Sequence, residues 1–301
     1  MLKVSLSLLI WMGVAGCRHS APPAPVKPTV APTSVATGTS HQTVEPPSTT
    51  NATLVGFVPT PKLFLGAPPE VKQVALTFDA GADSAAVPLL LQTLTEHHVH
   101  CTFFLTGAFC KHFPEQVKMI ADAGMELGNH SFHHPKFTTK SDDKIREELN
   151  SAEQEIVQSC GRGAKPLFRY PFGDSDKRVR TLVAAEGYQA IQWSVDSLDS
   201  VGDEKNADFV VNRILKKLKP GGITLMHVSR IESAKSLPRI FDYLDKQGIQ
   251  VVPVSQLLIA NANAEKEAAA AKAARRAARV DKGKVNPTDN TQDKEVVPPT
   301  K

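Results

Sequence analysis

The sequence predicts an α/β fold, a distorted or incomplete (β/α) barrel of about seven parallel strands, and two observations indicate it. Apolar runs typical of buried strands alternate with amphipathic helical patterns over about 200 residues. Ionisable residues recur where the predicted strands end, at the edge where the loops of a barrel converge. An open doubly wound sheet is the alternative topology. Both chain ends lack the alternation, so we expect disordered N- and C-terminal segments.

The strand patterns begin with Val74 to Asp79 and continue over 101–105, 125–130, 166–170, 188–196, 223–227 and 249–254. Helical patterns lie between them over 88–98, 114–124, 141–161, 177–187 and 206–222, and residues 236–248 lead to the last strand. Pro88 suits a first helical turn, and Gly124 suits a helix end. Ser141 is a favourable cap for a helix whose apolar stripe includes Ile145 and Leu149. Strands that alternate with helices form parallel sheets covered by helices.

The first seventeen residues have the pattern of an export signal. Lys3 precedes a short apolar run over 4–12, and the segment ends in Val14-Ala15-Gly16-Cys17. These last four residues resemble the lipobox of bacterial lipoproteins, in which the cysteine is lipidated. An ordinary signal peptide ending near a cysteine is the alternative. We therefore expect a lipoprotein signal peptide over 1–17 and a cell-envelope protein, in the outer membrane and periplasm or at the cell surface, anchored through a lipid on Cys17.

Composition divides the remaining chain into three segments. Residues 18–56 are rich in Pro, Thr and Ser, which predicts an extended linker. Residues 57–262 carry the strand and helix patterns and form the predicted domain. Residues 263–301 form an Ala/Lys/Arg-rich tail, where an isolated helix is marginal because large apolar residues are almost absent. A solvated helical tail or a weak contact with an anionic envelope polymer are the two interpretations of this segment.

Charge and cysteine content exclude some classes of function. Lys and Arg exceed Asp and Glu by 35 − 31, a net charge of +4 concentrated in the tail, so nucleic-acid binding has no support. Three cysteines remain after Cys17, and one disulfide with one buried thiol would suit an exported protein. We expect Cys101 in the core, whereas Cys110 and Cys160 are a candidate pair.

Five ionisable residues fall at or near the ends of different predicted strands: Asp79, His130, Arg169, Asp196 and His227. Each has a plain structural explanation, such as a turn former, a surface ion pair or a core histidine. Their recurrence at one end of the sheet makes coincidence a weak explanation. Because that end carries the active site in barrel enzymes, the pattern indicates an enzyme.

Histidines spaced closely after the third strand are candidate metal ligands. His130 and His134 are four residues apart, and His133 offers a spacing of three, so spacing alone does not choose between them. Pro135 disfavours a helix interior here. Two imidazoles suit Zn²⁺ or a similar divalent metal, with positions left for water.

The motifs TFDAG, GNHSFHHP, FRYPFG, WSVDSLDS and ITLMH occur in this order. Together they resemble the five motifs of the polysaccharide deacetylases with a NodB homology domain, carbohydrate esterase family 4. The resemblance spans about residues 74–227 by its motifs and implies metal-dependent hydrolysis of N-acetyl groups on an amino-sugar polymer, with release of acetate.

The resemblance also implies roles for the residues of the acid–base pair. Asp79 corresponds to the general base, and Arg169 to the residue that orients it and holds its charge. His227 corresponds to the general acid, tuned by an aspartate of the fourth motif. We expect Asp199 in that role, with Asp196 as the second choice.

Metal binding and substrate binding follow from the same resemblance. His130 and His134 correspond to ligands of a divalent metal, expected to be Zn²⁺, which settles the spacing in favour of four. The backbone N–H of Phe172 corresponds to an oxyanion donor, at a position where the family usually has tyrosine. The residues implied to line the sugar and acetyl pocket are Trp193, Leu225 and Pro171.

Two departures from the family pattern stand out. The first motif usually reads TFDD, and Ala80 replaces its second aspartate, a metal ligand. Asp83 could supply the missing carboxylate if its loop folds back; otherwise water fills the position. Ser200 stands where the family often has tryptophan, which could open the substrate cleft.

Peptidoglycan is the nearest abundant substrate for an envelope protein, and the sequence leaves several alternatives open. One is a catalytically inactive lipoprotein that binds glycans, which the loss of the aspartate at Ala80 favours. The others are a chitin-like or exopolysaccharide substrate, and a different hydrolysis on the same fold, such as ester cleavage.

Overall fold

The computed structural model describes residues 54, 56–202 and 205–284 of the 301-residue chain. The predicted signal peptide with Cys17, nearly all of the predicted linker and the end of the predicted tail lie outside the described residues.

A parallel sheet forms the centre of the domain, in the order β5-β4-β3-β2-β1-β7-β6, with β8 pairing β1 beside this path. Its strands are β1 (Gln73–Ala80), β2 (Thr102–Leu105), β3 (Glu126–Asn129), β4 (Leu167–Phe168), β5 (Gln189–Ala190), β6 (Val195–Asp196), β7 (Ile223–His227) and β8 (Gln250–Val251). Every pairing between these strands is parallel. The sheet curves into an incomplete barrel, which confirms the predicted fold class.

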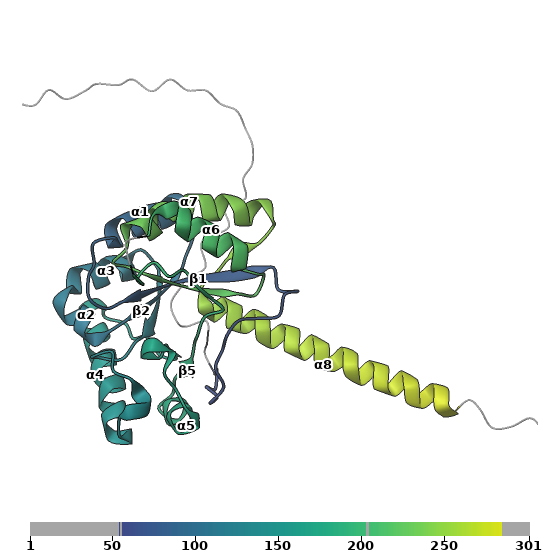
Figure 1. The fold of residues 1–301 in the computed structure, drawn as a ribbon. Coiled ribbons are helices and arrows are strands. Elements are labelled where there is room, and N and C mark those ends of the chain that lie inside the picture. Colours follow the sequence, from purple (N-terminus) through teal and green to yellow (C-terminus); the bar gives the residue numbers. More distant parts are fainter. Residues whose placement is uncertain (1–53, 55, 203–204, 285–301) are drawn as a thin grey trace, which may run out of the picture. The chain divides into compact units, whose positions relative to one another are not determined.

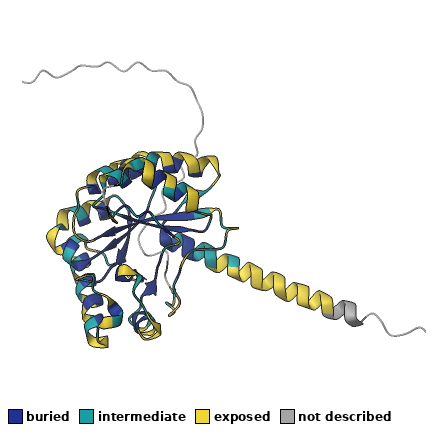
Figure 2. Ribbon diagram, in the orientation of Figure 1, coloured by how far each residue is buried: buried dark blue, intermediate teal, exposed yellow. Residues whose placement is uncertain are grey.

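Helices cover the outside of this sheet (Figure 1). They are α1 (Val87–Glu96), α2 (Gly107–His112), α3 (Pro114–Asp122), α4 (Asp142–Cys160), α5 (Lys177–Ala185), α6 (Ala207–Lys217), α7 (Ile231–Lys246) and α8 (Val254–Lys284). Figure 2 shows buried strands at the centre and helices whose outer faces are exposed. The long helix α4 begins after Ser141, whose side chain accepts a hydrogen bond from the Lys144 N–H, and ends at Gly161 with φ 76°. Both ends follow the sequence signals.

One predicted strand is wrong, because residues 188–196 form two strands at opposite edges of the sheet. β5 pairs with β4, whereas β6 pairs with β7. Between them, Ile191 bridges to Phe64, and the Ser194 N–H donates to the Ile223 carbonyl at 2.9 Å. The segment therefore spans the gap in the barrel, and no glycine or proline in it marks the break between the two edges.

Helix boundaries differ from the sequence pattern at three places. The short helix α2 lies in a stretch for which the sequence predicted no element. Helix α7 begins five residues before Ser236 and contains Pro238 in its interior. Helix α8 starts at Val254 and continues to Lys284, so the basic tail segment extends a helix whose first turn is anchored in the core. An anchored first turn removes the nucleation cost that makes an isolated helix marginal.

The three cysteines in the described residues are free thiols, so the candidate pair Cys110 and Cys160 forms no disulfide. Cys101 is fully buried in the main core cluster, as expected. The Cys160 Sγ contacts the backbone carbonyl of Ile156 at 3.2 Å. The expected pairing is therefore wrong for this structure, in which the partly exposed Cys160 thiol is satisfied by its own helix.

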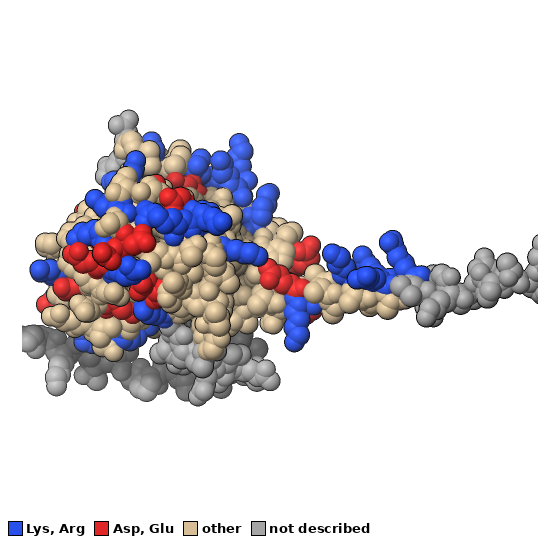
Figure 3. All heavy atoms as spheres, turned by 90° about the horizontal axis from the view of Figure 1, so that it is seen from below, with Lys and Arg blue, Asp and Glu red and all other residues tan. Residues whose placement is uncertain are grey.

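The outer part of α8 is exposed and basic. Its first residues, including Val254, Leu257 and Leu258, are buried beside the sheet, whereas residues 265–279 are exposed. Figure 3 shows Lys and Arg side chains gathered along this part of the helix. No helix in the described part of the chain is long and apolar enough to cross a membrane.

Candidate active site

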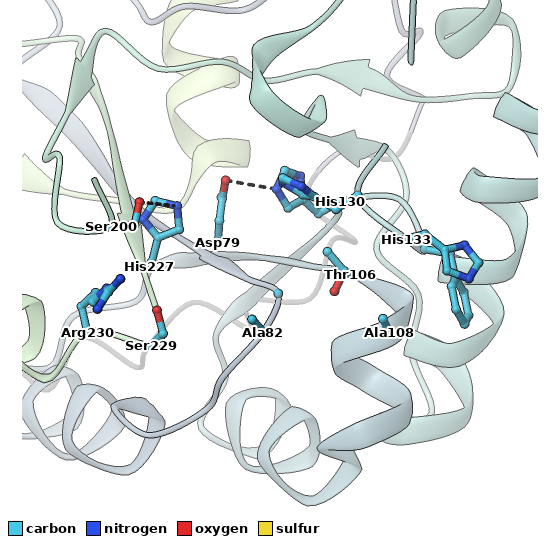
Figure 4. Close-up of a pocket in the computed structure, with 13 residues that line it drawn as sticks. Asp79, Ala82, Thr106, Ala108, His130, His133, Ser200, His227, Ser229 and Arg230 are labelled. Atoms are coloured by element: carbon cyan, nitrogen blue, oxygen red, sulfur yellow. Dashed lines mark hydrogen bonds and ion pairs between the residues drawn. The ribbon is translucent and has the colours of Figure 1, made fainter. Parts of the chain in front are cut away.

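The pairing of β1 with β7 determines the centre of the site, because it sets Asp79 directly opposite His227 in the register. Both residues lie at the carboxyl ends of their strands. They line a cleft of about 460 Å³. Its walls also include His130, His134, Ser200 and Arg230 (Figure 4). Strand ends that converge on one cleft are the expected geometry of a barrel active site.

Asp79 is a buried carboxylate whose charge is balanced by Arg169. The Arg169 Nη1 donates to the Asp79 Oδ1 at 2.7 Å and to the Thr77 hydroxyl at 2.8 Å, and the Arg169 side chain is completely buried. Burial favours the neutral acid, but the charge and hydrogen bond of Arg169, with the charge of His227, outweigh it and lower the pKa of Asp79. Asp79 is therefore ionised and can accept a proton at neutral pH.

His227 is held by Asp199. The His227 Nδ1 donates to the Asp199 Oδ1 at 2.7 Å, and Asp199 also accepts from the Ser233 hydroxyl at 2.6 Å. Burial favours the neutral ring, but the hydrogen bond and charge of Asp199 outweigh it and raise the pKa of His227. Asp196 instead accepts from the Leu198 N–H. The structure thus brings the first-choice aspartate, and not the second, against His227.

The two predicted ligand histidines lie together in the loop after β3. The His130 Nδ1 donates to the Arg169 carbonyl at 2.8 Å, which turns its Nε2 toward Asp79 Oδ2, 3.3 Å away. The His134 ring centroid is 4.8 Å from that of His130. Burial lowers the pKa of both rings, that of His134 to about 4. Both imidazoles are therefore neutral at physiological pH.

This arrangement fits two of the positions around a divalent metal. Ligating histidines usually donate their second ring N–H to a carbonyl or carboxylate, as His130 does. The described residues contain no group of three His, Cys, Asp or Glu side chains that could hold a metal. Ala80 is fully buried and packs in the main core cluster. The side chains that could hold a metal here are consequently the imidazoles of His130 and His134.

Asp83 does not lie beside His130 and His134. The expectation that it replaces the metal ligand lost at Ala80 is therefore wrong. Its side chain is exposed, and its Oδ1 accepts a hydrogen bond from the Ala85 N–H at 2.7 Å. It does not belong to the residues that line the cleft. Asp83 instead stabilises the turn that leads into α1.

Glu148 anchors the histidine loop, and the sequence analysis missed it. This buried carboxylate on α4 accepts from the backbone N–H groups of Phe132 and His133 and from the His133 Nδ1. His133 is thereby directed away from His130 and His134, with its side chain 63% exposed. An acidic residue beside Leu149 in the apolar stripe of α4 was the signal that could have revealed it.

Of the residues predicted for substrate and oxyanion binding, Phe172 contacts the histidine pair directly. Phe172 is exposed and its ring centroid is 4.5 Å from that of His134. Pro171 is buried before it, and the Trp193 ring lies 5.6 Å from the Arg169 guanidinium. Leu225 is buried in β7, opposite Thr77. None of these four belongs to the residues that line the cleft itself.

Backbone strain is concentrated in the loops that carry the site. Five non-glycine residues have positive φ, and four of them lie in these loops: Ser131, His134, Phe172 and Leu198. Such conformations are costly for residues with a side chain and persist where the surrounding structure enforces them. The site geometry is therefore fixed by the fold rather than by the preferences of the loop residues.

Ser229 and Arg230 also line the cleft, and the sequence analysis did not name them. They follow His227 by two and three residues, just beyond the end of β7. In a barrel, residues immediately after a strand face the site as the strand ends do. Their position was the signal that could have found them.

Comparison with known proteins gives the family. The model of the polysaccharide deacetylases matches residues 66–191. The peptidoglycan-N-acetylmuramic acid deacetylase PdaA of Bacillus subtilis (strain 168) is 35% identical over 188 residues, 62% of this chain and 72% of the relative. A peptidoglycan-N-acetylglucosamine deacetylase of Bacillus cereus is 31% identical over 189 residues, 62% of this chain and 68% of the relative.

A solved structure adds a different kind of relative. The crystal structure of a family 4 carbohydrate esterase pseudoenzyme from Bacillus anthracis matches with a TM-score of 0.63 and 31% identity, and the match covers 66% of this chain and 69% of that one. The identity to the curated relatives and the share of their length that is covered show common membership. The chain belongs to the polysaccharide deacetylase family, carbohydrate esterase family 4, whose enzyme class is the predicted polysaccharide N-deacetylase.

Proposed function

We propose that the cleft hydrolyses N-acetyl groups of bacterial peptidoglycan with a divalent metal, Zn²⁺ in the simplest case, bound by His130 and His134. The observation that carries the proposal is the opposition of Asp79 and His227 across the β1–β7 register. Each has its own charged partner at 2.7 Å. An ionised base and a protonated acid on two sides of one cleft are the requirement for amide hydrolysis.

The chain's own residues account for the proton transfers. Asp79 accepts a proton from the attacking water as the new C–O bond forms at the acetyl carbon. His227 donates a proton to the amide nitrogen as the C–N bond breaks, so acetate and a free amine leave. Arg169 keeps Asp79 ionised until Asp79 accepts the proton from water. We assign to the Phe172 N–H the stabilisation of the developing oxyanion.

A divalent metal, when bound, would supply Lewis-acid polarisation and a lowered pKa of coordinated water. His130 fits such binding because its Nδ1 donates to the Arg169 carbonyl, so the nitrogen available to an ion is Nε2, which lies 3.3 Å from the Asp79 Oδ2. His134 lies beside it as a second neutral imidazole.

Acetate release after metal exchange tests this function. The purified protein is treated with a chelator and assayed on purified peptidoglycan and on chitin oligomers, and then assayed again after Zn²⁺ is restored. We expect release from peptidoglycan that is lost with the chelator and recovered with Zn²⁺. Release that is unaffected by the chelator would contradict the metal assignment, and release from chitin oligomers alone would contradict the substrate.

A glycan-binding protein without catalysis is the second candidate, favoured by one observation. Ala80 removes the carboxylate that the family pattern places in the metal site, and a pseudoenzyme of the same family has a similar fold. Retention on peptidoglycan without acetate release from any acetylated glycan would establish this candidate.

We also propose that the protein is a lipoprotein of the cell envelope, anchored through Cys17. The support is the sequence pattern alone, a basic start, a short apolar run and Val14-Ala15-Gly16-Cys17. Cys17→Ser should move the protein from the membrane fraction to the soluble fraction of cells and abolish incorporation of labelled palmitate. An unchanged fractionation would contradict the anchor.

A further inference from the structure

The charges that line the cleft are unevenly matched. Asp79 pairs with Arg169, and Asp199 pairs with His227. Arg230 lines the same cleft, but its guanidinium forms no hydrogen bond or ion pair within the described part of the chain. Its Nε is moreover buried. A partly buried guanidinium that lacks an acceptor is a costly arrangement unless a ligand supplies the acceptor.

Arg230 is fixed at the His227 end of the cleft. Its backbone N–H donates to the His227 carbonyl, and helix α7 begins at the next residue. The positive end of the α7 dipole therefore adds to its charge. Figure 4 shows Arg230 beside Ser229 and His227, with Ser200 close to the His227 ring. The Ser200 Oγ is 3.5 Å from the His227 Nε2.

The other end of the cleft has a different chemistry. There Ala108 and Phe132 present apolar surface, and the charge of the nearby Glu148 is used by the histidine loop. Hydrogen-bond donors for an anion, namely a guanidinium and two hydroxyls, are thus gathered at the His227 end. A carboxylate on a substrate would find charge-assisted hydrogen bonds there and not at the opposite end.

We propose that Arg230 binds a carboxylate carried by the amino sugar on the ring carbon next to the N-acetyl group, as in a lactyl ether. This inference rests on the proposed function, since it takes the N-acetyl group to lie between Asp79 and His227. His227 protonates the leaving nitrogen, so the ring carbon that bears this nitrogen lies beside His227. The substituent on the adjacent carbon then falls next to Arg230, where the small side chain of Ser200 leaves room.

The proposal names a substrate class within peptidoglycan. The preferred sugar is a muramic-acid-type residue with a free carboxylate, in preference to an N-acetylglucosamine residue. Arg230 acts as a specificity-determining residue and takes no part in the proton transfers. Lysine at this position would keep the charge but lose the planar fork that matches a carboxylate.

The test compares three saccharides of equal length. One carries free lactyl carboxylates, the second carries the same groups as neutral methylamides, and the third is a chitin oligomer without lactyl groups. Binding is measured by calorimetry in an Asp79→Asn background, and kcat/KM is measured from acetate release with otherwise native protein. The variants are Arg230→Gln and Arg230→Lys. Arg239→Gln is the matched control, because Arg239 is an exposed arginine on the same helix that pairs with Asp208.

We expect Arg230→Gln to reduce the preference for the carboxylate saccharide over its methylamide by about 10- to 100-fold, in Kd and in kcat/KM. Arg230→Lys should retain part of the preference, and Arg239→Gln all of it. Equal preference for the carboxylate and its methylamide in the native protein, or equal losses on all three saccharides in Arg230→Gln, would overturn the proposal.

The binding experiment separates this inference from the proposed function. A carboxylate preference that depends on Arg230 in calorimetry, without acetate release from any saccharide, would support the subsite and contradict the deacetylase function. Acetate release that does not depend on the carboxylate or on Arg230 would support the function and overturn the subsite.

Discussion

The two walls of the cleft differ in how their ionisable groups are satisfied. The acid–base wall consists of Asp79, Arg169, His227 and Asp199, and each acidic group in it has a charged protein partner at 2.7 Å. The histidine wall consists of His130 and His134, two imidazoles whose pKa values are lowered by burial. Ala80, at the position where the family pattern has a third metal ligand, is buried in the main core cluster.

This difference shows which part of the site the fold completes by itself. On the acid–base wall the charges are balanced within the protein, so its geometry requires no bound ion. On the histidine wall the His130 Nε2 lies 3.3 Å from the Asp79 Oδ2, and the described residues contain no group of three side chains that could hold a metal. The ion that we propose would therefore act on the histidine wall, and the acid–base wall would keep its geometry without it.

The largest effect is expected from breaking the acid–base wall at Arg169. Arg169→Met leaves Asp79 buried without its counter-charge, which should lower the free energy of unfolding by about 3–5 kcal/mol and raise the pKa of Asp79. Denaturant unfolding measures the change in the free energy of unfolding. The pH dependence of acetate release measures the change in the pKa of Asp79. The exposed Arg178→Met serves as the control. A stable and fully active Arg169→Met would show that the pair is dispensable.

The histidine wall is tested by His134→Gln. This change should weaken Zn²⁺ binding by about 100-fold or more, because even partners that only orient a ligand contribute 10- to 100-fold. Calorimetric titration with Zn²⁺ measures the effect, and His133→Gln is the matched control since His133 is paired with Glu148. Equal losses in both variants would mean that the metal is bound elsewhere.

Ala80→Asp would add a carboxylate at the position where the family pattern has a third metal ligand. Without metal, the new carboxylate is buried, and we expect the free energy of unfolding to fall by about 1–3 kcal/mol. Zn²⁺ should then stabilise Ala80→Asp more than it stabilises the native protein, which thermal unfolding with and without the ion measures. Destabilisation that Zn²⁺ does not relieve would show that position 80 cannot face the histidines in this chain.

The smallest effect is expected from Asp199→Asn, which changes the pH dependence. His227 has a raised pKa, so its protonated form is present at low pH and is lost as the pH rises through that pKa. Without the Asp199 charge the pKa falls, so the alkaline limb of the kcat/KM profile should move to lower pH, with about a 10-fold loss of activity. The same linkage makes the pair's contribution to stability disappear at high pH. If the alkaline limb does not move, a group other than His227 determines it.

The sequence predicted the fold class and the order of strands and helices, because buried strands and amphipathic helices differ in period. It predicted some strands too long, since 166–170 and 249–254 contain the two-residue strands β4 and β8. It failed at residues 188–196, where one apolar run serves both edges of the barrel. The choice of Asp199 over Asp196 agrees with the geometry, although periodicity alone could not have made it. Glu148 and Arg230 were missed because a single charged residue has no periodicity of its own, although the places of Glu148 in the apolar stripe of α4 and of Arg230 just after β7 were usable signals.

Acetate release by the native protein and by Asp79→Asn, on the same N-acetylated glycan, tests the central claim most directly. Asparagine keeps the shape of the side chain but cannot accept the proton, so glycan binding serves as the control for folding. We predict equal amounts of acetate and free amine from the native protein, and a rate about 10³-fold lower for Asp79→Asn with binding retained. Equal rates for the two proteins would contradict the account, since the cleft would then hydrolyse the amide without its base.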